Sequence, residues 1–243
     1  TMRATLDWSL DLCTEDEQRL LAAVSIFAGG FDLDAVVAVA GGFVADPSDA
    51  LEGLIEQSLV VVEAPGVGGR YRLLEPVRVH AASRLTTSEG AQLAARHAAH
   101  FASLTAAARS GLWGPAQAEW LECLTTEHAN LATALTWLVD EGALAAASAI
   151  LADVWLYLAL RGHASEAMRW VERVSGAGGF AELPPESRAA ALVCSSGIAL
   201  AIGDSGRVLH DARLAASWAH EAADDRLRSD ALVQFSLAAL SQL

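Results

Sequence analysis

Residues 59–75 read Leu-Val-Val-Val-Glu-Ala-Pro-Gly-Val-Gly-Gly-Arg-Tyr-Arg-Leu-Leu-Glu, and they form the one stretch of this chain with a convincing β pattern. Residues 60–62 are valines, whose branched side chains suit a pleated strand, and residues 70–73 alternate between polar and apolar. Between them, Pro65 and three glycines supply the residues of a turn. We therefore predict a single β-hairpin here.

Helical patterns surround this hairpin on both sides. Before it we expect short helices over 3–12, from Thr14 to Phe27, from Asp32 to Ala40 and from Asp46 to Ser58, with Thr14, Asp32 and Asp46 as capping residues. After it we expect helices over 75–85 and 92–108. Several short helices followed by one hairpin predict a winged-helix domain over residues 1–85.

The rest of the chain is predicted to contain only helices. Residues 86–114 would form linking helices, ending at a break from Gly111 to Pro115, and residues 115–243 would form helical repeats. Ala143 to Gly176 spans 34 residues, the length of a tetratricopeptide repeat, although the period is irregular elsewhere. The predicted fold is thus mainly α: a winged helix followed by an α-solenoid of tetratricopeptide-like helix pairs.

Composition limits the function. The chain has a net charge of −14 and no lysine, so it cannot contain the lysine of a nucleotide-binding phosphate loop. Its three cysteines are scattered, which favours a reducing, cytoplasmic location. The most apolar stretch, from Ala143 to Leu160, has Asp153 in its middle, so we expect no membrane segment.

Several short motifs resemble those of one protein family. They are Thr5-Leu6-Asp7-Trp8-Ser9, Phe27-Ala28-Gly29-Gly30-Phe31, Tyr71-Arg72-Leu73-Leu74-Glu75 and Glu127-His128-Ala129-Asn130-Leu131. Together they resemble the segment that follows the nucleotide-binding domain in bacterial signal-transduction ATPases of the NB-ARC-like (STAND) class, including LuxR-type and antibiotic-regulator-type transcription factors. The resemblance implies a winged helix followed by tetratricopeptide-like repeats. ATP or ADP would bind to an upstream domain outside this segment.

The resemblance also implies a contact with that upstream domain. In the family, a Met-His-Asp motif just after the wing places a histidine on the nucleotide's β-phosphate. Leu73-Leu74-Glu75 stands at this position, so Leu74 replaces the histidine. Glu75 retains a carboxylate, which could face the nucleotide-binding domain or could stabilise the N-terminus of the next helix. Leu74 and Glu75 are therefore the candidate contacts with the nucleotide-binding domain.

Direct DNA binding is the alternative reading of a winged helix. The helix before the hairpin would enter the major groove, but it carries Asp49, Glu52 and Glu56 and no basic residue. On the wing, Arg70 and Arg72 do not reverse this charge. We therefore expect no direct contact with nucleic acid and treat both arginines as candidate protein-interaction residues.

The remaining candidates lead to an interaction module and not to an enzyme. His97 and His100 have a spacing found in metal sites but no third ligand nearby, so we expect solvated or capping histidines and no metal. Trp120 and Trp155 would lie in the core or line a ligand groove. The predicted function is a non-catalytic regulatory segment of a multidomain ATP-dependent transcriptional regulator, whose repeats sense a protein, peptide or small molecule. An enzymatic site in the helical array and an oligomerisation scaffold remain alternatives.

Overall fold

The computed structural model describes residues 8–64 and 69–240. They form two compact units, each composed of two separate segments of the chain. Unit 1 comprises Thr1–Phe101 and Thr126–Ala134, and unit 2 comprises Ala102–Thr125 and Leu135–Leu243. The predicted domains 1–85, 86–114 and 115–243 are each one continuous stretch, whereas each unit combines two stretches. The predicted domain limits therefore stay a prediction.

Three helices of unit 1 begin directly after the predicted capping residues Thr14, Asp32 and Asp46. The helices of this unit up to residue 101 are α2 (Glu15–Val24), α3 (Leu33–Ala40), α4 (Pro47–Glu56), α5 (Glu75–Ala82) and the first part of α6 (Thr87–Gly111), and residues 8–11 are also helical. Thr14 and Glu17 form a reciprocal capping box at the start of α2. The Asp32 side chain accepts a hydrogen bond from the Ala35 N–H, which caps α3.

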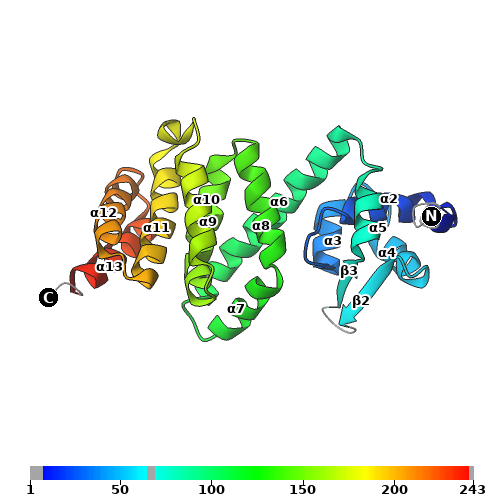
Figure 1. The fold of residues 1–243 in the computed structure, drawn as a ribbon, viewed down its shortest axis with the longest axis horizontal. Helices are drawn as coiled ribbons and strands as arrows, with labels where there is room; N and C mark the ends of the chain where they lie inside the picture. Colours follow the sequence, from blue (N-terminus) through cyan, green and yellow to red (C-terminus); the bar gives the residue numbers. More distant parts are fainter. Residues whose placement is uncertain (1–7, 65–68, 241–243) are drawn as a thin grey trace. The chain divides into compact units, whose positions relative to one another are not determined.

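The predicted hairpin is confirmed and belongs to a three-stranded antiparallel sheet. Strands β2 (Val60–Ala64) and β3 (Arg70–Leu73) pair with Val61 opposite Arg72, and β1 (Phe31–Asp32) pairs with the other edge of β3. Strand β1 is not predicted from the sequence, because a two-residue strand has no alternating pattern to detect. The predicted turn residues 65–68 lie outside the described residues. Figure 1 shows the longer strands beside the helices of unit 1.

The core of unit 1 is aliphatic with an aromatic centre. The Phe27 and Phe31 rings lie 5.1 Å apart, and Phe27 also contacts the His97 ring of α6 at 5.2 Å. Burying each large apolar side chain contributes about 1.5–3 kcal/mol to folding. The other large, fully buried side chains of this core include Leu20, Leu21, Val36, Leu54, Leu93 and Phe101.

Unit 2 is made of helices. After α7 (Gln117–Thr126) and α8 (His128–Asp140), which each have residues in both units, come α9 (Leu144–Leu160), α10 (Ala164–Ser175), a short 3₁₀ turn (Phe180–Glu182), α11 (Pro185–Ile202), α12 (Ser205–Glu221) and α13 (Asp225–Leu240). No strand follows residue 115 in the described part of the chain. The predicted fold class, mainly helical with a winged helix at its N-terminal end, is confirmed.

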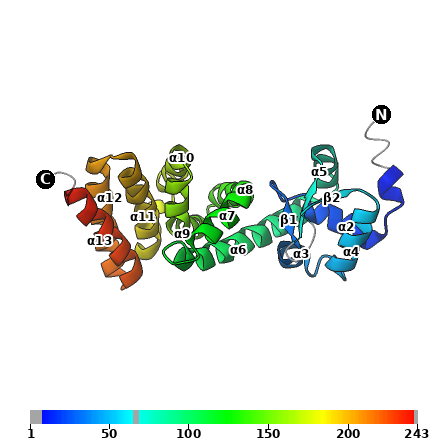
Figure 2. The same cartoon turned by 90° about the horizontal axis from the view of Figure 1, so that it is seen from below.

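Consecutive helices of unit 2 pack side by side, as both views show (Figure 1, Figure 2). Helix α11 packs against α9 and α12, and α12 packs against α13. Buried alanines such as Ala147, Ala189 and Ala215 lie in these helices, and their small side chains allow close approach of the backbones. Gly162 and Gly203 turn the chain with positive φ of 82° and 80°, a conformation that glycine adopts at little cost.

The described helices contain no segment that is both long and apolar enough to cross a lipid bilayer. The stretch from Ala143 to Leu160 instead contributes the 17-residue helix α9, which is mostly buried within unit 2. No disulfide joins Cys13, Cys123 and Cys194.

Candidate functional site

The solvent face of α4 is acidic. Ala50, Leu51 and Leu54 point into the core of unit 1, whereas Asp49 and Glu52 are exposed. Ser48 and Glu56 are exposed on the same helix, which contains no basic residue. This face therefore offers hydrogen-bond acceptors and hydroxyls and cannot itself neutralise a phosphate.

The two wing arginines have different roles. Arg70 Nη1 forms an ion pair with Glu127, and Nη2 donates to the carbonyl oxygens of Gly29 (2.8 Å) and Thr126 (3.1 Å). Arg72 Nε lies 2.7 Å from Glu63 Oε1, and both of these side chains are about 40% exposed. An exposed pair of this kind stabilises the fold by only about 0–1 kcal/mol. Arg72 is therefore the wing cation that a ligand could recruit, and Arg70 is held within the fold.

The buried Asn130 side chain forms hydrogen bonds with the backbone of the turn that follows α2. Its Oδ1 accepts hydrogen bonds from the N–H groups of Ala28 (2.9 Å) and Gly29 (3.4 Å), and its Nδ2 donates to the Gly30 carbonyl oxygen (2.9 Å). Nδ2 also donates to Glu127 Oε2 at 2.7 Å. The sequence motif from Glu127 to Leu131 contributes to the family resemblance, but the sequence alone predicts no role for it. Its role in the structure is to close the Ala28–Gly30 turn.

His97 is buried among aromatic rings, so the expectation of a solvated or capping histidine is wrong for this residue. Its ring centroid lies 4.6 Å from that of Phe101, and its Nε2 has no hydrogen-bond partner among the described residues. Burial lowers the pKa of His97 to about 4, a hydrogen bond to Asn130 opposes this shift, and nearby His100 adds to it. His97 is therefore neutral near pH 7 and packs as a core ring.

Leu74 and Glu75 lie where the wing ends and α5 begins. Leu74 is the N-cap residue of α5 and makes no side-chain capping bond, and 44% of its surface is exposed. Glu75 accepts two hydrogen bonds from Arg78, from Nε at 2.8 Å and Nη2 at 2.7 Å. These bonds hold the pKa of Glu75 below its usual range. The candidate contact with a nucleotide-binding domain stays a prediction at these two exposed positions.

The two candidate tryptophans of unit 2 lie in different surroundings. Trp120 packs so closely on Gly111 that a side chain at position 111 would collide with its indole ring. Trp155 is 7% exposed, and its ring lies 5.9 Å from that of Trp113, which is 60% exposed. Trp155 and Trp113 line one wall of a cavity of about 250 Å³. The prediction that a tryptophan lines a ligand groove therefore concerns Trp155 and not Trp120.

An ionic cluster lies beside this cavity and was not identified from the sequence. Arg109 of α6 binds Asp153 of α9 through Nη1 (3.2 Å) and Asp230 of α13 through Nη2. Burial raises the pKa of both carboxyl groups, and Arg109 opposes that shift. Because these residues lie on three helices far apart in sequence, no local motif could reveal the cluster.

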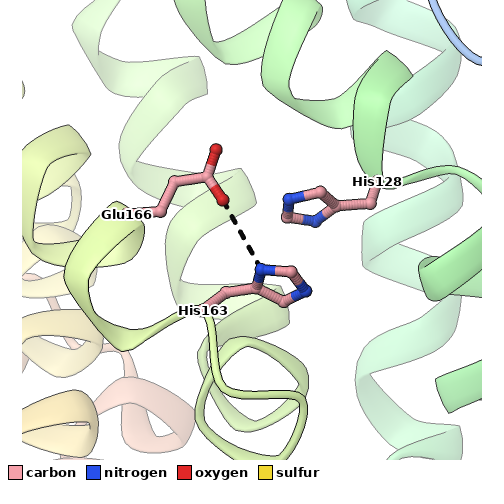
Figure 3. A group of neighbouring side chains, drawn as sticks. All are labelled: His128, His163 and Glu166. Carbon is pink, nitrogen blue, oxygen red and sulfur yellow. Dashed lines mark ion pairs between the residues drawn. The ribbon is translucent and has the colours of Figure 1, made fainter.

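A histidine and a glutamate pair at the start of α10. Figure 3 shows the His163 ring beside the Glu166 carboxylate, with His163 Nδ1 3.6 Å from Glu166 Oε2. His128, also drawn there, belongs to unit 1. The His163 ring centroid also lies 5.7 Å from that of Tyr157. Ring packing and the carboxylate together account for the position of His163, and we assign no metal to the pair.

Comparison with known proteins identifies the first part of the chain. Residues 14–86 match the family described as "Winged helix-turn-helix domain". The chain contains a winged-helix domain. The matched segment extends from α2 to α5, so it includes the acidic face of α4 and both wing arginines.

Longer relatives give a functional context. The chain is 36% identical over 183 residues to the "Putative HTH-type transcriptional regulator Rv0890c" of Mycobacterium tuberculosis (strain H37Rv) and to its counterpart Mb0914c in Mycobacterium bovis. These matches cover 72% of this chain, which spans about a fifth (20%) of each relative's length. It is also 34% identical over 124 residues to the "Uncharacterized protein Rv0894" of M. tuberculosis, covering 47% of the chain and 30% of that protein. No solved structure matches the chain.

These findings correct one expectation. We expected no direct contact with nucleic acid, and the winged helix-turn-helix match together with the named HTH-type relatives points instead to DNA binding. The expectation relied on the charge of α4 weighed against the two wing arginines. Charge sets the strength and salt dependence of DNA binding, but base edges are also read by neutral and acidic acceptors.

Proposed function

We propose that this chain is part of a transcription regulator and that its winged-helix domain contacts duplex DNA. The observation that carries the proposal is the winged helix-turn-helix match over residues 14–86, the segment that contains α2 to α5 and the hairpin. The names of the relatives, HTH-type transcriptional regulators, support it. A regulator of this kind would work in the cytoplasm.

The α4 face would supply base readout. In this domain α4 precedes the wing, the position of a recognition helix that enters the major groove. Glu52 and Asp49 can accept hydrogen bonds from the N4 amino group of cytosine, and the Ser48 hydroxyl can donate or accept. Such contacts would favour particular sequences and would add no general attraction to DNA.

The wing would supply the phosphate contact. Arg72 can exchange its exposed partner Glu63 for a phosphate at little energetic cost, whereas Arg70 is committed to Glu127 and two carbonyl groups. With roughly one or two phosphates neutralised, the logarithm of the binding constant should fall with the logarithm of salt concentration with a slope of about −1 to −2. Proteins with many basic contacts show much steeper slopes.

The test selects duplexes from a random pool with the whole chain at about 50 mM salt and measures their binding by fluorescence anisotropy. We expect a small set of enriched sequences, a shallow salt slope and weaker binding by Arg72→Ala. Arg169→Ala, an exposed arginine of α10 in unit 2, is the matched control and should bind normally. Absence of any enriched duplex, or equal binding by Arg72→Ala, would refute DNA contact through this domain.

We further propose that the helix pairs of unit 2 are tetratricopeptide-like and receive a signal, and that the longer protein carries a STAND-type ATPase domain. The motif resemblance supports this, as does the greater length of the relatives. Leu74 and Glu75 would then face the nucleotide-binding domain. The test is the sequence of the gene. We expect it to encode a phosphate-binding loop upstream of Thr1. A gene that encodes no such loop anywhere would rule the ATPase out.

A further inference from the structure

The cavity of unit 2 has aromatic and aliphatic walls and one charged group. It is lined by Trp113, Trp155, Leu200, Val233, Leu237, Asp230 and Gln234, with a volume of about 250 Å³. This is slightly smaller than the roughly 300–1,000 Å³ of pockets for drug-sized ligands. The elements that supply this lining, α9, α11, α13 and the segment after α6, all belong to unit 2.

The tryptophan wall is fixed by its neighbours. A side chain at position 197 would collide with the Trp155 ring and with the Gln234 amide, so Gly197 lets Trp155 lie against α11. The Trp113 ring lies 5.9 Å from Trp155 at an angle of 54° and is 60% exposed. Indole faces are electron-rich and attract cations within about 6 Å, and the exposed Trp113 ring is accessible to such a cation.

Among the polar groups of the lining, Gln234 and Asp230 are both hydrogen-bonded to neighbouring residues, and Asp230 is the charged one. Gln234 uses both ends of its amide, since Oε1 accepts from Ser196 and Nε2 donates to the Val193 carbonyl oxygen at 3.3 Å. Asp230 binds Arg109 through Oδ2, and its Oδ1 makes no hydrogen bond among the described residues. The lining therefore includes one carboxylate, whose Oδ1 can accept a further hydrogen bond.

The charges around this carboxylate leave a negative excess. The carboxylates of Asp153, Asp224 and Asp230 interact with the two guanidinium groups of Arg109 and Arg226, so acidic groups outnumber basic groups by one. No basic residue lines the cavity itself. The excess favours a positively charged ligand.

We propose that this cavity binds a small organic cation, an amine with an apolar body. The apolar part would lie between the tryptophans, Leu200 and Leu237, and the ammonium group would bind Asp230 Oδ1 and the indole faces. The inference deepens the proposed signal-receiving role of unit 2 and rests on it for its biological meaning. The binding itself does not depend on DNA contact by unit 1.

The test uses three probes of similar size: phenethylamine (a cation at pH 7), 2-phenylethanol (neutral) and 3-phenylpropionate (an anion). Binding to the whole chain is measured by calorimetry and by tryptophan fluorescence. We expect the amine to bind about tenfold more tightly than the alcohol, and the anion not to bind. Equal affinity for the alcohol and the amine would overturn the proposal, as would tighter binding of the anion.

Two variants and one control locate the site. Asp230→Asn should abolish the preference for the amine, while Arg109 keeps its bond to Asp153. Trp113→Ala should weaken amine binding about tenfold. It should not unfold the chain, because the Trp113 side chain is mostly exposed. Glu221→Gln, at the end of α12 and outside the cavity lining, should bind like the wild type. Unchanged amine binding in both variants would overturn the proposal. DNA binding is measured separately, so failure of one proposal leaves the other testable.

Discussion

Asn130 Oδ1 accepts a hydrogen bond from the backbone N–H of Ala28 at 2.9 Å, although 102 residues separate the two along the chain. The same side chain donates to the Gly30 carbonyl oxygen. One amide therefore binds an N–H group and a carbonyl group of the same turn in unit 1. Glu127 binds Asn130 and Arg70, and Arg70 returns to the Gly29 carbonyl oxygen. The turn, the wing and the start of α8 are thereby joined in one closed network.

Replacing Asn130 tests this network. Asn130→Ala leaves the buried polar groups of the turn without partners, and each such group costs about 1–3 kcal/mol. We expect unit 1 to lose about 3 kcal/mol of stability in urea unfolding followed by hydrogen exchange. Thr133→Ala is the control, because the Thr133 hydroxyl bonds only within its own helix, to the Ala129 carbonyl oxygen. Similar losses of stability for both variants would show that the Asn130 hydrogen bonds do not stabilise the turn.

The turn also needs glycine at position 30. Gly30 has a φ of +86°, and a Cβ there would lie 2.8 Å from the Tyr71 carbonyl oxygen. Gly30→Ala should therefore destabilise unit 1 by about 2 kcal/mol or more. Gly90 of α6 has open space around it, so Gly90→Ala should instead stabilise the helix by up to about 1 kcal/mol. Thermal unfolding of both variants checks these opposite signs.

His97 predicts how unit 1 responds to acid. The pKa of His97 is lowered to about 4 in the folded chain, whereas an unfolded histidine titrates near 6.5. The unfolded state therefore binds more protons between these values, and stability falls as the pH drops from about 6.5 towards 4, by up to roughly 3 kcal/mol. His97→Leu should flatten this part of the stability profile.

The exposed His220 provides the control for His97, since His220→Gln should keep the wild-type acid response. Histidine ring signals in NMR titrations give a direct reading: one histidine should titrate near pH 4, and its signal should vanish in His97→Leu. Parallel stability profiles for the wild type and His97→Leu would contradict the assignment.

Arg109 should matter far more than an exposed arginine of the same unit. Arg109→Leu leaves Asp153 and Asp230 without their shared cation, and breaking a buried pair in this way costs about 3–5 kcal/mol. Adding Asp153→Asn and Asp230→Asn should restore much of the loss. Arg173→Leu breaks the exposed pair with Asp140 and should cost less than about 1 kcal/mol in the same urea unfolding experiment. Equal losses for the two arginine variants would contradict this view.

The acidic face of α4 should limit non-specific attraction to DNA. If α4 lies in the major groove, the double variant Glu52→Gln and Glu56→Gln removes two charges near phosphates and should raise affinity for random duplex about fivefold at low salt. Glu119→Gln with Glu221→Gln, two exposed positions in unit 2, matches the change in net charge. Anisotropy with a random duplex measures both. An equal gain in the two double variants would show that net charge matters and the position of α4 does not.

Local sequence rules predicted much of the fold. Capping side chains at Thr14, Asp32 and Asp46 marked three helix starts, because each satisfies backbone N–H groups of its own first turn. The valines and the alternation around Tyr71 located the hairpin. Strand β1 was not predicted, because it is too short to have an alternating pattern and forms by the pairing of Phe31 with Tyr71.

The candidate sites were less accessible from sequence because they depend on distant partners. Arg70 and Arg72 look equivalent in the chain, yet Glu127, 57 residues away, holds one and leaves the other exposed. His97 was expected to be solvated, and only tertiary packing places it between Phe27 and Phe101. Trp155 lines a cavity because Gly197 of α11 lies against its ring and Gln234 of α13 forms part of the same lining.

The discontinuity of unit 1 has a consequence for biosynthesis. Its last segment, Thr126–Ala134, brings Glu127 and Asn130 to a turn that leaves the ribosome about a hundred residues earlier. The nascent winged helix therefore stays incomplete until α8 has emerged, and a polypeptide shortened to the matched residues 14–86 lacks the side chains that close it. Recombinant fragments intended to preserve this domain should extend at least to Ala134.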